Sequence, residues 1–312
     1  MIEAKIIADS ISETGKRITT FQLKYWRAIH SEFMTHRVFS RNASSSRAIP
    51  VTKLVDATLA DPAMPIHWGA KQSGMQADHE CDALIEVPVH LREAWRQFYP
   101  AAAQTYFATR AQWWYFGTWL SAQICIGFDK AGYHKQIANR QLEHSHHISI
   151  VVTATEWDNF FELRCHPDAQ PEMQDLALRM REAMNASTPT LLREGEWHLP
   201  YVTDQELSEI LENSRSESKG LELIRKVSAA RCCRVSYLRH DGLKATIGEE
   251  LALCDRLIGA NPIHASPFEH QATPDVYAYR AAPTWMSAGL HGNLVGWIQY
   301  RKLIESRFNH GE

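Results

Sequence analysis

Residues 18–47 read ITTFQLKYWRAIHSEFMTHRVFSRNASSSR, and they pass from a strand pattern through a helix pattern into a polar loop. Residues 18–25 alternate with period two and are rich in Thr, Phe and Tyr, which predicts a strand with Phe21 and Leu23 on one side. Residues 26–36 change to helical spacing, and the small polar and basic residues that follow are closed by a proline. This stretch therefore predicts a strand, a helix and a loop in immediate succession.

Length and composition limit the function classes. A chain of 312 residues that is 45% apolar suits one large domain or two modest ones, without a disulfide or metal to stabilise it. The net charge of −3 excludes the global basic field that holds a nucleic-acid polymer or an anionic membrane. The six cysteines follow neither CxxC pairs nor a secreted framework, and no signal peptide or membrane-length apolar stretch is evident. We expect a soluble, cytoplasmic protein with reduced thiols and no metal site.

Further elements are predicted from periodicity and punctuation along the chain. We expect an irregular segment over 52–100 that ends in a short helix, a buried helix over 101–128, a strand over 148–155, a core helix over 169–186 and a linker over 187–203. After the linker we expect a helix from Asp204 to Leu211 capped by Thr203, a second helix after Gly220, a helix over 246–258 and a final amphipathic helix over 293–307.

The segment 36–47, HRVFSRNASSSR, concentrates three arginines, a histidine, an asparagine and four serines. Arginine forks and the backbone N–H groups of a small-residue loop bind phosphate, although a solvated basic loop is the plain alternative.

Four motifs together give the sequence a family resemblance. The segment 36–47 resembles the signature RHRxxSxNxxSxR of the ThyX flavin-dependent thymidylate synthases. Residues 230–236, ARCCRVS, resemble the family's ARVS with two extra cysteines, and residues 264–270, HASPFEH, resemble its H-x-[ST]-P-F-E-H. Residues 159–164, NFFELR, followed by DAQPE at 168–172, resemble its N-F-x-x-L-R stretch with AQxE soon after.

The motif order differs from the family's common order, in which ARVS and PFEH come first. The resemblance therefore implies a circularly permuted α+β fold, with a ThyX-like central twisted, mainly antiparallel sheet flanked by long helices in one catalytic domain. Its expected parts are the strand, helix and signature loop at 17–50, an irregular insertion at 52–100, a helical part with the Arg164 segment at 101–186, a linker joining the usual termini at 187–227, the ARVS and PFEH part at 228–270, and a C-terminal extension at 271–312.

The resemblance also implies a reaction, the methylation of dUMP to dTMP. Members of this family use methylenetetrahydrofolate as carbon donor and reduced FAD as hydride source, with NADPH reducing the flavin, and they assemble shared active sites in a homotetramer. A dUMP 5-hydroxymethylase, in which water instead of hydride ends the one-carbon transfer, stays open. A catalytically idle nucleotide-binding or assembly protein with the same fold stays open as well.

The resemblance assigns roles residue by residue. The residues expected to bind dUMP are Ser44, Ser45, Ser46, Arg47, Arg140 and Arg164, and Arg164 is the expected catalytic residue because a permanent charge stabilises an anionic pyrimidine. The residues expected to contact FAD are His36, Arg37, Asn42, Asn159, Ser236, Ser266 and Glu269, and His264 is expected on the folate and NADPH side. The departures from the family pattern are Thr35 for an arginine, Glu32 for a glutamine, Ala43 for a glutamate, and Thr153 and Thr155 at an N-x-R position. We expect Arg41, or Arg301 and Lys302, to replace the missing positive charge.

Three further features have competing interpretations. His144, His146 and His147 suggest metal ligation, but their spacing fits no ligand template well, which favours ordinary solvent-facing or core-edge histidines. The aromatic residues 113–119 are more typical of core packing than of flavin stacking. Cys165, next to Arg164, resembles a reactive thiolate, but the family's chemistry needs no protein nucleophile.

Overall fold

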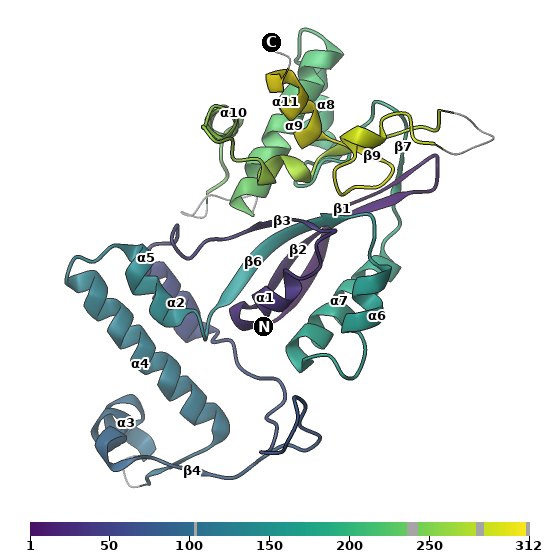
Figure 1. Cartoon of the computed structure of the whole chain (residues 1–312). Helices are drawn as coiled ribbons and strands as arrows, with labels where there is room; N and C mark the ends of the chain where they lie inside the picture. The colour runs from purple at the N-terminus through teal and green to yellow at the C-terminus, as the bar shows by residue number, and fades with distance from the viewer. Residues whose placement is uncertain (103–104, 236–242, 279–283, 310–312) are drawn as a thin grey trace.

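A computed structural model describes residues 1–102, 105–235, 243–278 and 284–309. Its centre is a sheet in the order β3-β6-β2-β1-β7 (Figure 1). The strands are β1 Glu3–Ser12, β2 Arg17–Trp26, β3 Ser40–Ala43, β6 His147–Ala154 and β7 Thr190–Leu192. The sheet is mixed, since β1 pairs with β7 in parallel and the other neighbours pair antiparallel. The strands predicted at 18–25 and 148–155 are confirmed as β2 and β6.

Helices surround the sheet, and several short elements connect them. The helices are α1 His30–Phe33, α2 Val51–Ala60, α3 Arg92–Phe98, α4 Arg110–Lys130, α5 Lys135–Ala138, α6 Asp158–Arg164, α7 Pro171–Ala186, α8 Asp204–Glu212, α9 Glu217–Arg234, α10 Ile247–Ile258 and α11 Tyr300–Asn309. The short strands are β4 Ile85–Glu86, β5 Phe107–Ala108, β8 Ala272–Pro274 and β9 Trp297–Gln299, and the 3₁₀ segments include η4 Asn139–Leu142 and η5 Ser266–Glu269. The architecture is a mixed α and β fold.

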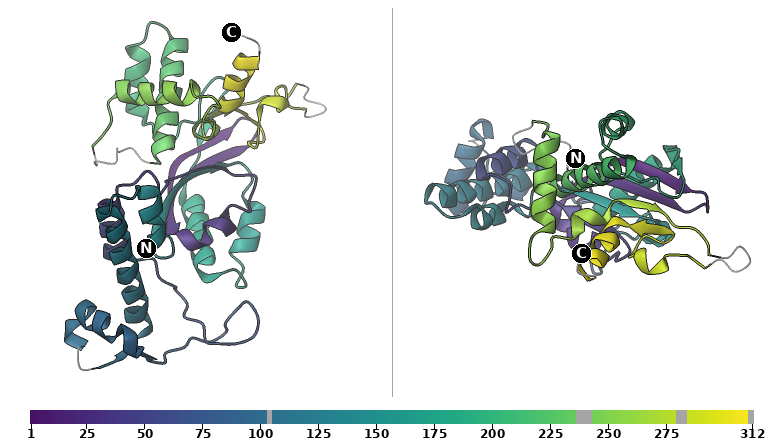
Figure 2. Two further views of the ribbon diagram at one scale, coloured as in Figure 1. Left: turned by 60° about the vertical axis from the view of Figure 1, so that its left-hand side comes forward. Right: turned by 90° about the horizontal axis from the view of Figure 1, so that it is seen from above.

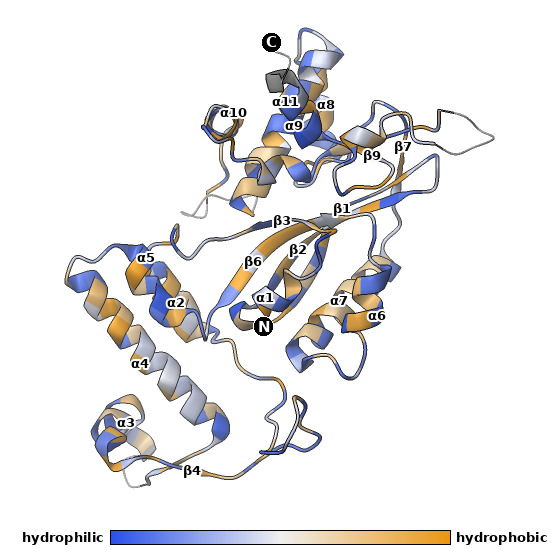
Figure 3. Ribbon diagram, viewed as in Figure 1, coloured by the Kyte–Doolittle hydropathy of each residue, from blue (hydrophilic) through white to orange (hydrophobic). Residues whose placement is uncertain are grey.

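The two faces of the sheet differ in polarity. Register places Phe21 opposite Val152 and Leu23 opposite Ile150, and all four side chains belong to the main core under α1, α6 and α7. Because side chains alternate along a strand, Gln22, Lys24 and Ser149 face the other way. Figure 3 shows β6 as hydrophobic along most of its length with a hydrophilic end near α2. The second face therefore offers polar groups to whatever covers it.

The second face is covered by the C-terminal half of the chain. Val151 of β6 packs with Tyr201, Cys232 and Val235, so the end of α9 rests on the sheet. Figure 2 shows α8, α9 and α10 on the opposite side of the sheet from α6 and α7. The predicted cap of α8 is confirmed, because the Thr203 side chain accepts a hydrogen bond from a backbone N–H group in a capping box, and Thr246 caps α10 in the same way.

An arm built from α2, α3 and α4 extends from the sheet (Figure 1). The α4 aromatics Trp113, Phe116 and Trp119 pack with Trp95 of α3. They therefore form a core of their own, as the more typical interpretation of this aromatic run predicted.

Several predicted boundaries are wrong for identifiable reasons. The segment predicted as irregular begins with α2, because Val51, Leu54, Val55 and Thr58 recur at helical spacing and are buried, whereas its prolines come only after the helix ends. The helix predicted as buried over 101–128 begins at Arg110, since Thr109 forms a capping box with Gln112, and only Phe116, Thr118, Ala122 and Cys125 of its 21 residues are buried. The final helix begins at Tyr300, after glycines with positive φ and strand β9.

The signature segment and the linker also differ from their predictions. The helix predicted over 26–36 is a 3₁₀ turn followed by the four residues of α1. The loop after it contains β3, and the linker contains β7, because each forms hydrogen bonds with a strand distant in sequence.

Among the described residues, no helix combines the length and apolarity that a membrane crossing requires. All six cysteines are free.

Candidate functional site

The signature segment is held as an edge strand of the sheet. In β3, Ser40 lies opposite Thr153 and Asn42 lies opposite Val151 of β6. Because β3 is extended, the two ends of the signature lie at different places, with His36 near α6 and Ser44 to Arg47 near α2. The residues predicted for one site therefore form three groups along the strand.

The first group joins Arg164 to the start of the signature. Arg164 Nε donates a hydrogen bond of 3.0 Å to His36 Nε2, and its guanidinium forms an ion pair with Glu32. Arg164 Nη2 also lies 3.4 Å from the Thr35 hydroxyl. Burial, with the nearby charges of Arg164 and Arg41, lowers the pKa of His36 to about 4, so His36 is neutral at pH 7 and accepts this bond. The guanidinium is fixed in direction while 20% of its side chain remains exposed.

The second group joins three motifs that are far apart in the sequence. The Asn42 amide donates to the carbonyl oxygens of Cys232 (2.8 Å) and Cys233 (3.2 Å), and its oxygen accepts from the Ser266 hydroxyl at 2.9 Å. Nearby, Glu269 forms an ion pair with Arg301. One asparagine thus connects the signature to the ARCCRVS and HASPFEH segments.

The third group lies where the signature leaves the sheet. The Ser44 hydroxyl accepts a hydrogen bond of 3.1 Å from the Ser149 N–H. The buried Ser46 hydroxyl donates to Glu143, and Arg140 forms an ion pair with the same carboxylate at 3.1 Å. The structure therefore brings Ser46 and Arg140 together, but around a negative charge. Ser45 and Arg47 are exposed beside them.

The remaining predicted residues do not join these groups. Arg37, Asn159 and His264 are exposed, and Ser236 lies outside the described residues. The predicted flavin contacts consequently fall into two sets, one around His36 and one around Asn42.

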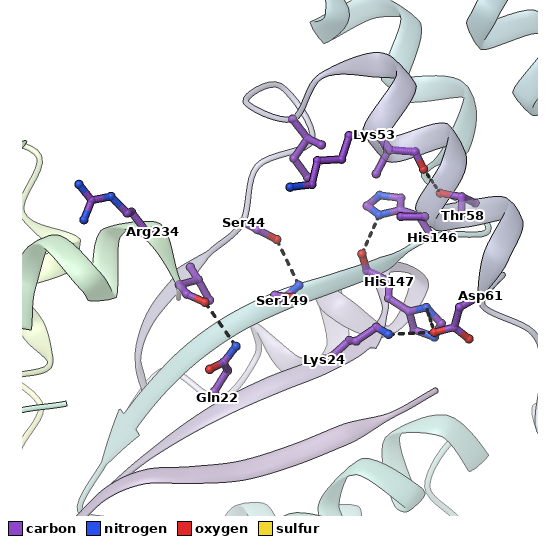
Figure 4. Close-up of a pocket in the computed structure, with 14 residues that line it drawn as sticks. Gln22, Lys24, Ser44, Lys53, Thr58, Asp61, His146, His147, Ser149 and Arg234 are labelled. Atoms are coloured by element: carbon purple, nitrogen blue, oxygen red, sulfur yellow. Dashed lines mark hydrogen bonds and ion pairs between the residues drawn. The ribbon is translucent and has the colours of Figure 1, made fainter. Parts of the chain in front are cut away.

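A cavity of about 340 Å³ opens on the polar face beside the third group (Figure 4). Its lining residues come from β2, β6, α2, the end of α9 and the loop after β3, and they include Gln22, Lys24, Ser44, Lys53, Thr58, Asp61, His146, His147 and Ser149. Of the predicted site residues that the structure describes, Ser44 alone belongs to this lining, so motif matching missed the other lining residues. The period-two pattern of 18–25 could have indicated Gln22 and Lys24, because it places both on the face opposite Phe21.

The residues around Asn42 provide hydrogen-bond donors and acceptors of the kind that a flavin needs. The donor and acceptor set fits, since Asn42, Ser266 and Glu269 offer an amide, a hydroxyl and a carboxylate from adjacent segments. Within this chain, however, these groups already bind one another or Arg301, and none of them lines the cavity. A flavin held by these residues has to replace the Asn42–Ser266 and Glu269–Arg301 contacts.

The surroundings of the histidine run and of Cys165 bear on whether these residues bind metal or act as a nucleophile. In the described part of the chain, no three His, Cys, Asp or Glu side chains gather as metal ligands do. The pKa of the Cys165 thiol is raised by burial, against a small opposing effect of Arg181. A raised pKa disfavours the thiolate, which is the nucleophilic form.

This arrangement places a polar face with lysine, histidine and hydroxyl groups beside the signature segment. Residues 16–190 match the model of the thymidylate synthase complementing protein family. The chain belongs to this family, and the resemblance inferred from the motifs is confirmed.

Proteins of known structure that are similar to this chain include a UMP/dUMP methylase and a thymidylate synthase. A UMP/dUMP methylase, PolB from Streptomyces cacaoi bound with 5-Br UMP, is 15% identical with a TM-score of 0.36, and the match covers 59% of this chain and 88% of that chain. Thymidylate synthase X from Helicobacter pylori with FAD and dUMP is 17% identical with a TM-score of 0.33, covering 54% of this chain and 67% of that chain. No curated protein sequence matches the chain significantly.

Proposed function

We propose that this protein converts dUMP to dTMP, with methylenetetrahydrofolate as carbon donor and with reduced FAD as the hydride source. The observation that carries the proposal is the convergence on Asn42, where the signature meets the ARCCRVS and HASPFEH segments through direct hydrogen bonds. These segments are about 190 and 224 residues away along the chain, and they need not have met if the motif matches were chance. Membership of the thymidylate synthase complementing protein family supports the same reaction.

Arg164 is the proposed catalytic residue. As the pyrimidine C5 becomes nucleophilic, negative charge develops on the ring, and a fixed guanidinium stabilises that charge without prior reorganisation. Glu32 and the neutral His36 hold the guanidinium in one orientation. A bound flavin supplies the hydride that completes the methyl group, NADPH is its proposed reductant, and Asn42, Ser266 and Glu269 are the residues proposed to hold it.

Two proposals concern the arrangement of the chain. We propose that the motif order results from circular permutation, because Ala272, just after HASPFEH, packs with Ile18 at the start of β2, so a short connection could once have joined them.

We also propose a cytoplasmic homotetramer. The exposed apolar residues Ile124, Tyr133 and Ile137 on and near α4 and α5 offer a surface for contact between copies, and light scattering measures the assembly.

The reaction is tested by anaerobic incubation of photoreduced protein with dUMP and methylenetetrahydrofolate, followed by mass analysis of the nucleotide. Formation of dTMP is expected, and it should fall sharply in Arg164→Ala but not in Arg179→Ala. Arg179 is a suitable control because it is an exposed arginine on α7. A 5-hydroxymethyl product would identify the hydroxymethylase, and an unchanged nucleotide in flavin-loaded protein would indicate an idle homologue.

A further inference from the structure

The C-terminal segment 291–301 lies across two of the motif segments, although it belongs to none of them. The Asn293 side chain accepts a hydrogen bond from the Ser40 hydroxyl of the signature at 3.1 Å. Gln299, which is 2% exposed, donates from Nε2 to the Glu269 carbonyl oxygen of HASPFEH at 3.2 Å. Figure 1 shows β9 and α11, which follow in the chain, on the same side of the sheet as α9. The C-terminal part of the chain therefore bonds directly to the motifs.

Helix α11 is fixed to the body of the protein. Tyr300 and Ile304 are each 7% exposed, and they belong to a core cluster with Phe268 of HASPFEH. Trp297, just before the helix, is fully buried. Movement of the whole helix would expose this apolar surface to water, which is unfavourable. A rearrangement at this end of the molecule is therefore confined to the polar side chains of α11.

Arg301 is the α11 side chain that reaches Glu269, one of the residues proposed to hold a flavin. Its guanidinium forms an ion pair with the Glu269 carboxylate, and its Nε donates to Glu305 Oε1 at 2.6 Å, one turn further along the helix. Glu305 also pairs with Lys302 at 2.9 Å. Arg301 thus binds two carboxylates at once, one on the motif and one on its own helix. It can leave Glu269 without losing its other partner.

The Glu269 carboxylate has one cation among the described ion pairs, and that cation is Arg301. A flavin presents N–H and O–H groups, and a carboxylate accepts from such donors. Arg301 and a flavin therefore compete for the same acceptor. The attraction between the guanidinium and the carboxylate opposes flavin binding, whereas the second carboxylate at Glu305 lowers the cost of releasing Glu269.

We propose that Arg301 is a latch on Glu269, which it holds until a flavin binds and then leaves for Glu305. This inference rests on the proposed function for the flavin as the ligand of Glu269. Two carboxylates compete for one guanidinium, so changes at its two ends have opposite effects on flavin affinity. Removing Arg301 frees Glu269 for the flavin. Neutralising Glu305 leaves Arg301 more firmly on Glu269.

The test measures the affinity of the full-length protein for FAD by the change in flavin fluorescence. Arg301→Met should bind FAD up to about fivefold more tightly than the wild type, since a partly exposed ion pair is worth no more than about this factor. Glu305→Gln should bind FAD about twofold more weakly for the same reason. Arg179→Met is the matched control and should bind like the wild type, because Arg179 pairs only with Asp175 of its own helix, on the opposite side of the sheet. Circular dichroism confirms that each variant is folded.

A further substitution decides whether both effects act through Glu269. In Glu269→Gln the ion pair with Arg301 is absent. Adding Arg301→Met or Glu305→Gln to this variant should therefore leave its FAD affinity unchanged. An effect of Arg301→Met that persists in the Glu269→Gln protein would show that Arg301 acts elsewhere, and the latch would be wrong.

The outcomes separate the latch from the reaction. Weaker FAD binding by Arg301→Met would make Arg301 a flavin ligand and overturn the latch. Unchanged FAD binding, in a protein that forms dTMP, would overturn the latch and leave the reaction standing. Tighter binding by Arg301→Met, in a protein that never forms dTMP, would keep the latch and refute the reaction. If neither the wild type nor Arg301→Met binds FAD, the latch and the proposed function both fail.

Discussion

Replacing Arg231 with methionine should destabilise the protein strongly, because this arginine neutralises a carboxylate inside the molecule. The Arg231 side chain is 2% exposed and that of Glu250 is 0% exposed, and Arg231 Nε donates to Glu250 Oε1 at 2.8 Å. Arg231 Nη1 also donates to Glu206 at 2.8 Å and to the Tyr201 carbonyl oxygen. One guanidinium therefore joins α8, α9 and α10 directly beside the Cys232 carbonyl that binds Asn42.

The magnitude follows from burial. Removing one partner of a buried ion pair costs about 3–5 kcal/mol, and without Arg231 the Glu250 carboxylate keeps only the longer contact of 3.6 Å to Arg234 among the described ion pairs. Since about 1 kcal/mol shifts Tm by roughly 2–4 °C in chains of 150–250 residues, a fall of about 6 °C or more is expected by circular dichroism. Arg179→Met is the control, because the Arg179–Asp175 pair is exposed and such pairs are worth about 1 kcal/mol or less.

A second substitution tests the reason for the loss. In Arg231→Met with Glu250→Gln, the buried carboxylate charge is gone, so part of the lost stability should return.

The dependence of stability on acid pH gives an independent check. Burial opposes ionisation of Glu206, but hydrogen bonds from Arg231 and Lys244 lower its pKa to about 2. This stabilisation is present above the unfolded pKa of about 4.3 and is lost as the pH falls toward 2, and it should be smaller in Arg231→Met. A single variant as stable as the control, or a double variant no more stable than the single, would refute this reasoning.

Three other substitutions test the proposed site. Arg164→Ala should remain folded and flavin-binding with little turnover, as measured by flavin absorbance and dTMP formation, and near-normal turnover would remove Arg164 from the mechanism. Arg47→Lys should weaken dUMP binding by about 1.5–3 kcal/mol and flavin binding far less, because an ammonium cannot form a bidentate contact; equal losses in titrations of both ligands would show that the loop is misplaced. Cys165→Ala should keep most activity because burial disfavours the thiolate, and a folded, flavin-loaded but inactive variant together with a 5-fluoro-dUMP adduct at Cys165 of the wild type would contradict this.

The elements that the sequence predicted well are those specified by local patterns. The strands β2 and β6 have dense β-branched and aromatic residues, and α8 and α10 have capping boxes that fix their first turns. Strand β3 was not predicted, because Ser and Asn have low strand propensity and its order comes from pairing with β6. Single-sequence patterns cannot reveal such long-range pairing.

The candidate site shows the same division between local and long-range information. Motif matching identified Asn42, Ser266 and Arg164, which the structure places in direct contact with other motif residues. It did not identify Lys53 or His146, since a lysine on a helix and a histidine before a strand are common features. Only the fold shows that both side chains line one cavity.

The departures from the family signature lower the positive charge around Arg164. Thr35 replaces an arginine and Glu32 replaces a glutamine, so the end of the signature near Arg164 is less positive by two charges than the family pattern. The candidates expected to compensate are already engaged: Arg41 donates to backbone carbonyl oxygens, and Arg301 and Lys302 both form ion pairs with Glu305. Lys24 and Lys53 line the cavity next to Ser44, and Lys24 forms an ion pair with Asp61 there. The Glu32 carboxylate that replaces the glutamine forms an ion pair with Arg164 and, with His36, holds the guanidinium in the orientation proposed for its role at the pyrimidine ring.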